Sequence, residues 1–387
     1  MIINFVNKNI INMSSNNILL EVAKVFFKLG LIAFGGPAAH ISMMEKEVVN
    51  KRKWMTSEHF LDLVGATNLI PGPNSTEMTM HCGFERAGWK GLFVAGLAFI
   101  IPAVLMTGTL AYFYVTYGEV PDVAPFLYGI KPAVMAIILG ALFKLGKKAL
   151  KNWQLGLIGV MVVASSFLGV NEVTSILCAG LVGMLWFGRG GATSARSLVP
   201  ILLLQSTPIV IKKVGLGKLF LVFLKIGAVL FGSGYVLIAY LDGELVENLG
   251  WLTKPELLDA IAIGQFTPGP VLSTATFVGY QIEGYWGAIL ATLGIFLPSF
   301  LFVLILNPII PKLRKSKLTR GFLDAVNIAS LGIMAAVTLQ LGYDVLVDWK
   351  SISIAILATG ITFGLKKVSS FWIVIGGSAI GFLFTLV

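Results

Sequence analysis

Four glycine- and proline-rich breaks interrupt the apolar segments of this 387-residue sequence, two in each half. The first half has FGGP at residues 34–37 and IPGPNST at residues 70–76. The second half has FGSG at residues 231–234 and TPGP at residues 267–270. A broken helix leaves backbone N–H and C=O groups unpaired, and the start of the next half-helix carries a partial positive charge. Such donors, with small hydroxyl and amide side chains beside them, suit a tetrahedral oxyanion.

Two lysines lie inside the apolar segments that carry the first break of each half. Lys28 and Lys225 are 197 positions apart, and each lies six residues before its break. A charge inside a bilayer costs about 2.5–3.5 kcal/mol on insertion scales, so it normally faces a cavity or a partner. One interpretation is a counter-charge for an anionic substrate. The alternative is a structural role, either snorkelling to the interface or pairing with an acid such as Glu21.

The breaks and the lysines together define a predicted substrate-binding set. Proline suits the first position of a helix, and asparagine or serine suits its N-cap, so residues 71–76 predict the start of a half-helix. The predicted set is Lys28, Gly35, Gly36, Asn68, Pro71, Gly72, Pro73, Asn74, Ser75, Thr76, Lys225, Gly232, Ser233, Gly234, Gln265, Thr267, Pro268, Gly269, Pro270 and Ser273.

Four other residues could carry protons. Glu77 follows the second break and has no acidic counterpart at Thr274, and acids inside membranes often serve in proton relays. Histidine as a residue type titrates near neutral pH, so His40 is a candidate, although a lone histidine near a helix end is commonly structural. Asp62 and Asp259 begin the second segment of each half. They are interpreted either as proton carriers or as ordinary helix-start residues. We find no catalytic, nucleotide-binding or metal-binding motif, so we predict neither an enzyme nor a cofactor or metal.

A single offset relates the two halves of the chain, which indicates an internal repeat. We predict a tail over residues 1–19, a first repeat over 20–187, a linker over 188–216 and a second repeat over 217–387. Identical residues recur 197 positions apart up to Phe99 and Phe296, and then 196 apart after a slip of one residue. Examples are Phe26 and Phe223, Gly30 and Gly227, Glu47 and Glu244, Trp54 and Trp251, Trp89 and Trp286, Pro102 and Pro298, and Trp153 and Trp349.

The composition is that of a membrane protein. Hydrophobic residues make up 56% of the chain and charged residues 12%, whereas soluble domains average about 25% charged residues. The net charge is +10, but the basic residues cluster in the connections between apolar segments. This pattern is typical of cytoplasmic loops and argues against nucleic-acid binding.

Loop charges predict how the six apolar segments of each repeat cross the bilayer. In the first repeat, basic connections flank the second segment on both sides, which places them on the same, cytoplasmic side. We therefore expect that segment to be a re-entrant hairpin that turns at residues 71–73. Five crossings per repeat invert the second copy, whose first connection is acidic. The prediction is an all-α polytopic protein with two inverted-topology repeats, about ten spanning helices, two re-entrant hairpins and both termini outside. If the first segment of each repeat also re-enters, the count changes.

The breaks also carry a resemblance to a known family. Residues 34–41, 68–76 and 264–271 resemble the signatures of the chromate ion transporter family in its two-domain form, and the resemblance extends over roughly residues 20–387. It implies a multi-pass protein of the bacterial plasma membrane that extrudes chromate and confers resistance, by proton-coupled or potential-driven exchange. Ser233 departs from the family pattern, which often has glycine there, and it adds a hydroxyl group.

The expected function is thus secondary transport of an anion. Sulfate or another oxyanion is an alternative substrate, because chromate and sulfate share shape and charge. A non-transporting membrane scaffold or receptor is an alternative of another class, although a scaffold has no use for duplicated breaks and intramembrane lysines. The expected partners are the oxyanion, the lipid bilayer and a proton or counter-anion. The sequence leaves the oligomeric state open.

Overall fold

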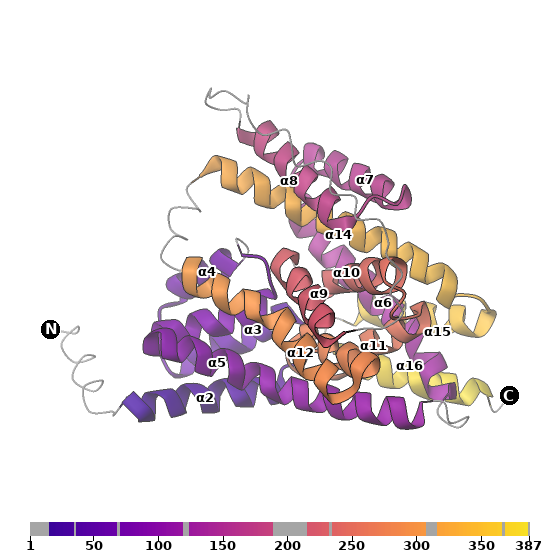
Figure 1. Ribbon diagram of the computed structural model, residues 1–387, viewed down its shortest axis with the longest axis horizontal. Helices are drawn as coiled ribbons and strands as arrows, with labels where there is room; N and C mark the ends of the chain where they lie inside the picture. The colour runs from indigo at the N-terminus through magenta and orange to yellow at the C-terminus, as the bar shows by residue number, and fades with distance from the viewer. Residues whose placement is uncertain are drawn as a thin grey trace.

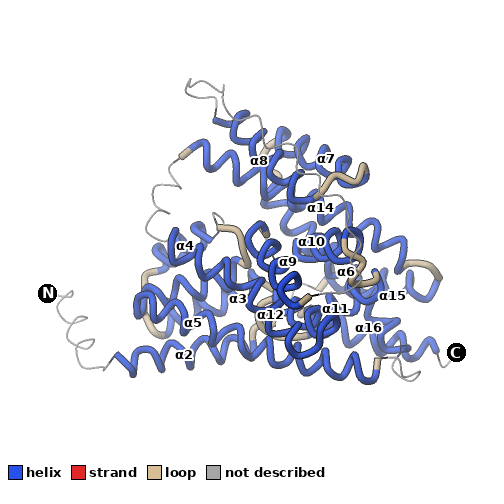
Figure 2. The backbone as a smooth tube through the Cα atoms, viewed as in Figure 1, coloured by secondary structure: helices blue, strands red, loops and turns tan. Residues whose placement is uncertain are grey.

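The computed structural model is an assembly of packed helices (Figure 1). It describes residues 15–34, 36–67, 70–118, 124–188, 215–231, 234–306, 316–365 and 368–385. Within these residues the chain forms helices and short connections but no strand (Figure 2). The predicted all-α class is therefore confirmed. Most of the predicted tail and linker lies outside the described residues.

The same order of elements occurs in both halves, which is the structural counterpart of the sequence repeat. Each half has a helix, a break, a short helix that widens into a π-helix, a second short helix, a second break and then longer helices. The first half contains α2 (Ser15–Ile32), α3 (Pro37–Glu45), η1 (Lys46–Lys51), α4 (Ser57–Thr67), α5 (Asn74–Tyr117), α6 (Ala124–Ala149), α7 (Trp153–Phe167) and α8 (Glu172–Gly188). The second contains α9 (Leu216–Val229), η2 (Gly234–Val236), α10 (Leu237–Leu241), η3 (Asp242–Asn248), α11 (Lys254–Phe266), η4 (Val271–Ser273), α12 (Thr274–Leu306), α14 (Lys317–Val345), α15 (Trp349–Gly364) and α16 (Ser370–Thr385).

The long helices α5 and α12 each contain a sharp turn at a glycine. Gly88 has φ +61° and Gly284 has φ +59°, values that glycine adopts without the steric cost of a side chain. These two glycines are 196 positions apart, so the slip in the repeat falls before them and not after Phe99, where sequence identity places it. The pairing of Trp89 with Trp286 is consequently one position out of structural register.

The two repeats are interlocked through their later helices. α6 of the first repeat packs against α15 and α16 of the second, while α14 of the second packs against α7 and α8 of the first (Figure 1). Within each repeat the first helix packs on the long helix, α2 on α5 and α9 on α12. Gly30 and Gly227 permit this close contact, because a Cβ at either position would meet the backbone of the long helix.

Four of the described helical segments are long and apolar enough to cross a membrane, at residues 74–117, 125–149, 271–305 and 318–345. Many large apolar side chains on the outer helices are exposed, including Leu105 at 64%, Val160 at 66% and Ile356 at 65%. Exposed apolar surface on this scale marks a contact with a membrane or partner, and the four apolar segments favour a membrane.

Candidate functional site

The four breaks meet in the interior, where each repeat holds a break of the other. The backbone N–H of Gly72 donates to the carbonyl of Leu230 at 2.6 Å, and the N–H of Gly269 donates to the carbonyl of Ala33 at 2.9 Å. Gly269 lies 197 positions after Gly72, and Leu230 lies 197 positions after Ala33. The two hydrogen bonds are thus equivalent under exchange of the repeats. Backbone groups that the breaks would leave unpaired in a membrane are satisfied across the repeat interface.

The backbone conformation at both crossing points suits glycine. Gly72 has φ +141° and Gly269 has φ +94°, a region that other residues rarely adopt. A Cβ at Gly72 would overlap a carboxylate oxygen of Glu77 and the hydroxyl of Ser299. A Cβ at Gly269 would lie 2.8 Å from the Cβ of Ala103. The two glycines therefore let a loop of one repeat approach the long helix, α12 or α5, that packs against it.

The first-repeat break carries a buried carboxyl group. Glu77, in the first turn of α5, has no exposed surface, and neither carboxylate oxygen has a hydrogen-bond partner within the described part of the chain. Ser299 of α12 is equally buried and lies on the same side of Gly72. Thr76, next to Glu77, is also buried with its hydroxyl unpaired among the described residues. Burial without a partner strongly disfavours an ionised carboxylate, so Glu77 is suited to hold a proton.

The second-repeat break carries hydroxyl groups in place of the carboxyl group. Thr107 of α5 lies 3.4 Å from the hydroxyl of Thr267 and 3.2 Å from that of Ser273. All three side chains are buried. Thr267 donates to the carbonyl of Gly264 at 3.2 Å. Each hydroxyl has one proton, and those of Thr107 and Thr267 serve these contacts. Ser273 accepts from Thr107, so its own proton can be donated to an anion.

The first breaks of the two repeats are also in contact. Gly36 has φ +80°, and a Cβ there would lie 2.7 Å from the hydroxyl of Tyr235, which follows Gly234 at the other first break. His40 is buried, and its ring packs edge-on against Phe99 with the centroids 5.7 Å apart. His40 therefore lies inside the protein beside the break, on the helix that the break starts.

The start of α5 differs in detail from the sequence prediction. Pro73 is the N-cap residue, and no side chain caps the helix. Asn74 is the first residue inside the helix, followed by the buried Ser75. The predicted half-helix therefore begins at the predicted place but without the predicted side-chain cap. Of the remaining predicted residues, Pro71, Pro268 and Pro270 frame the two crossing glycines, and Gln265 is buried one turn before Gly269.

The two predicted lysines are paired with acids instead of facing the breaks. Lys28 lies 3.7 Å from a carboxylate oxygen of Glu47, and Lys225 lies 2.7 Å from one of Glu244. Their side chains are 60% and 45% exposed. The glutamates are themselves repeat equivalents, 197 positions apart. This geometry fits the interpretation in which the lysines pair with acids and have a structural role. The partner of Lys28 is Glu47 and not Glu21, which contacts Arg52 and Arg86. We therefore leave both lysines out of the proposed substrate site.

The two predicted aspartates have different surroundings. Asp62 is exposed on α4. Asp259 is buried on α11, where it lies 3.3 Å from the Nζ of Lys131 on α6 and accepts a hydrogen bond of 2.8 Å from the hydroxyl of Tyr114 on α5. Matching positions in the sequence thus have different surroundings. Neither lies in the first turn of its helix, so the helix-start interpretation does not describe them.

Four predicted residues, Gly35, Asn68, Gly232 and Ser233, lie outside the described residues.

A comparison with known families decides what this arrangement belongs to. The profile described as "Chromate transporter" matches twice, over residues 20–184 and 217–382. The chain belongs to the chromate transporter family. It is 30% identical to a "Probable chromate transport protein" of Synechococcus elongatus, over 90% of this chain and 91% of the relative. It is 29% identical to a "Chromate transport protein" of Cupriavidus metallidurans, over 94% and 92%, and 31% identical to one of Pseudomonas aeruginosa, over 87% and 85%. No solved structure matches.

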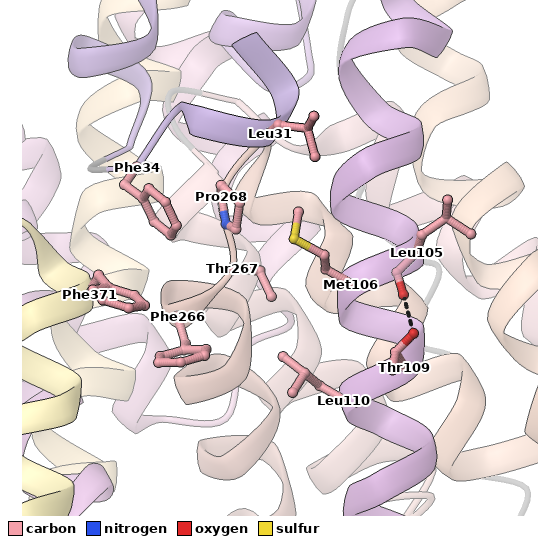
Figure 3. Close-up of a pocket in the computed structure, with 10 residues that line it drawn as sticks. All are labelled: Leu31, Phe34, Leu105, Met106, Thr109, Leu110, Phe266, Thr267, Pro268 and Phe371. Atoms are coloured by element: carbon pink, nitrogen blue, oxygen red, sulfur yellow. Dashed lines mark hydrogen bonds between the residues drawn. The ribbon is translucent and has the colours of Figure 1, made fainter. Parts of the chain in front are cut away.

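As a member of this family the chain is embedded in a membrane, and an apolar cavity opens beside its breaks. The cavity has a volume of about 520 Å³ and is lined by Leu31, Phe34, Leu105, Met106, Thr109, Leu110, Phe266, Thr267, Pro268 and Phe371 (Figure 3). Phe371 of α16 bridges the two repeats: its ring centroid lies 4.8 Å from that of Phe266 and 5.1 Å from that of Phe34. These aromatic rings cover one side of the second-repeat break.

Sequence reasoning missed four residues that the fold brings to the breaks or to the ion pair of Asp259. These are Thr107, Lys131, Tyr235 and Ser299. Thr107, Tyr235 and Ser299 follow or interrupt apolar runs in which no local pattern distinguishes them. Lys131 had a detectable signal, because charged residues inside spans are rare.

Proposed function

We propose that this protein is a secondary active transporter that exports chromate across the bacterial plasma membrane and so confers chromate resistance. The observation that carries the proposal is the reciprocal crossing of the breaks, with Gly72 bonded to Leu230 and Gly269 bonded to Ala33. Duplicated broken helices that meet between two repeats are the usual construction of a transporter site near the middle of the bilayer. Family membership supports chromate as the substrate.

The proposed topology is the inverted repeat with about ten spans and two re-entrant hairpins. α4 has 11 residues, so it extends about 16 Å at 1.5 Å per residue, about half of a 30 Å hydrocarbon core. The part of α5 before Gly88 is similarly short, and the chain reverses there: Gly83 and Gly91 are in contact. Two half-length helices that meet at Gly72 fit a hairpin that enters and leaves on one side.

The two halves of the crossing have different chemistry, and we assign them different tasks. The hydroxyl cluster of Thr107, Thr267 and Ser273 offers neutral donors to an oxyanion. The buried carboxyl of Glu77, without a partner in the described residues, provides a site for a coupled proton. An exchange of chromate against protons then needs only that access alternates between the two faces.

The first test measures chromate uptake into inverted membrane vesicles, with and without an imposed proton gradient, and with sulfate as the competing substrate. We expect saturable chromate uptake that increases with the gradient. Absence of chromate uptake from vesicles that contain the inserted protein contradicts the proposal. Uptake of sulfate in preference to chromate would identify sulfate as the substrate instead.

A second test replaces Glu77 by glutamine, which has nearly the same shape and cannot exchange a proton. We expect Glu77→Gln to insert normally, because the buried side chain remains neutral, and to lose the response to the proton gradient. Glu58→Gln is the matched control, since Glu58 is exposed on α4. If Glu77→Gln keeps the full gradient response, Glu77 is not the coupling site.

A further inference from the structure

A half-buried lysine lies beside the helices that form the second-repeat break. The Nζ of Lys131 is 3.3 Å from Asp259, and its side chain is 24% exposed, against 60% for Lys28 and 45% for Lys225. Tyr114 completes the group by donating to the other carboxylate oxygen of Asp259 at 2.8 Å. We call Lys131, Asp259 and Tyr114 the charged triad.

The charged triad and the hydroxyl cluster lie on the same pair of helices. Asp259 precedes Thr267 by eight residues of α11, about 12 Å along a helix, and Tyr114 follows Thr107 by seven residues of α5, about 10 Å. α5 and α11 are in contact. Polar groups thus occur at two levels of one helix interface, while the neighbouring cavity walls are apolar.

In the described part of the chain, the positions that match Asp259 and Lys131 do not form a lysine–aspartate pair. Asp62 matches Asp259 in the sequence but is exposed, and the position that matches Lys131 is Asn327. An ion pair such as Lys131 with Asp259 that served only to hold α6 against α11 would be equally useful in both repeats. Its presence in one copy, on the side of the hydroxyl cluster, points to a role in handling the substrate.

The positive charge of Lys131 suggests what this role is. A doubly charged oxyanion inside a bilayer needs a compensating cation as well as hydroxyl donors, whereas Lys28 and Lys225 are exposed and paired with glutamates. Lys131 can provide this charge. Without an anion Lys131 would be an unpaired, largely desolvated charge, and its contact with Asp259 prevents that.

Resting on the proposed function, we propose that Lys131 is an anion-binding residue of the transport path, and that Asp259 is its internal competitor, which holds Lys131 until a doubly charged oxyanion replaces it. Tyr114 is a positioning residue, because its hydrogen bond keeps the Asp259 carboxylate in place. When an anion has replaced Asp259 as the partner of Lys131, the Tyr114 hydroxyl can still donate to the Asp259 carboxylate.

The experiment measures binding of chromate and of sulfate to the purified full-length protein in detergent, by ligand-dependent thermal stabilisation, together with vesicle uptake. We expect Asp259→Asn to bind chromate more tightly and to turn over more slowly, because the competitor is gone. We expect Lys131→Gln to weaken binding at least about tenfold, the loss typical of one hydrogen bond to a charged group. The matched control is the exposed ion pair between Lys151 and Asp324, at 2.6 Å, whose variants Lys151→Gln and Asp324→Asn should bind chromate as the parent does.

A neutral double variant guards against misfolding of either single variant. Lys131→Gln with Asp259→Asn leaves no unpaired charge, and we expect it to insert normally but to bind chromate as weakly as Lys131→Gln alone. Parental affinity in the double variant overturns the inference, as does weaker binding in a folded Asp259→Asn variant. A parental protein that neither binds nor transports an oxyanion overturns the proposed function itself, so the two failures are distinguishable.

Discussion

Replacing Gly72 by alanine adds one methyl group where the two repeats cross. The new Cβ would overlap the carboxyl group of Glu77 and the hydroxyl of Ser299, and the backbone would keep φ near +141°. A non-glycine residue in such a region costs about 1–3 kcal/mol, and overpacking a buried site costs about 1–3 kcal/mol more. Gly72→Ala should therefore lower the free energy of unfolding by about 2–6 kcal/mol, and the strain lies at the hydrogen bond from Gly72 to Leu230.

The same strain should lower the rate of transport as well as the stability of the protein. If only about 1.4 kcal/mol of the strain enters the transport barrier, the rate falls about tenfold. The assay is the initial rate of chromate uptake into inverted vesicles at saturating chromate, with the amount of inserted protein measured in the same membranes. We expect Gly72→Ala to lower the rate at least about tenfold and Gly72→Leu to abolish it, with insertion largely kept.

Gly360→Ala is the matched control. Gly360 lies within α15, and a Cβ there would meet no atom within 4 Å. Alanine should stabilise that helix by about 0.5–1 kcal/mol and leave uptake unchanged. A Gly72→Ala variant that transports at the parental rate would refute the reasoning, because it would show that the crossing tolerates a side chain.

Three further predictions address topology, pH and the substrate. Single cysteines at Lys51 and Glu247, both exposed, should react with impermeant reagents from opposite faces of the membrane; labelling from one face refutes the inverted repeat. Burial and the nearby Glu247 raise the pKa of Asp242, in η3 outside the spans, to about 6 from 3.8. Stability should therefore fall as the pH rises through this range, so Asp242→Asn should raise the melting temperature at pH about 7.5 and lose its advantage near pH about 4; an unchanged melting temperature at the higher pH contradicts this. Thr107→Val removes the hydroxyl that contacts Ser273 and should weaken chromate affinity about threefold to tenfold in the uptake assay, whereas parental affinity would exclude the cluster from the site.

Sequence alone determined the all-helical class and the two repeats, because these signals are local or periodic. Apolar segments, their glycine and proline breaks and the 197-residue offset are legible without coordinates, and they led to an all-helical membrane protein of the chromate transporter family. Glycine and proline act on the backbone of their own segment, so the positions of the breaks follow directly from their residue types.

Only the tertiary structure decided which side chains meet at those breaks. Thr107 contacts Ser273 across 166 positions, and Tyr114 contacts Asp259 across 145. Repeat symmetry suggested equal roles for the lysines and for the aspartates, yet the fold paired both lysines with glutamates and buried only Asp259. Symmetry in the sequence constrains the backbone, whereas each side chain's partner depends on what the other repeat presents at that point. A contact between distant segments leaves no local pattern, and for that reason the proximity of Thr107 to Ser273 and of Lys131 to Asp259 became visible only in three dimensions.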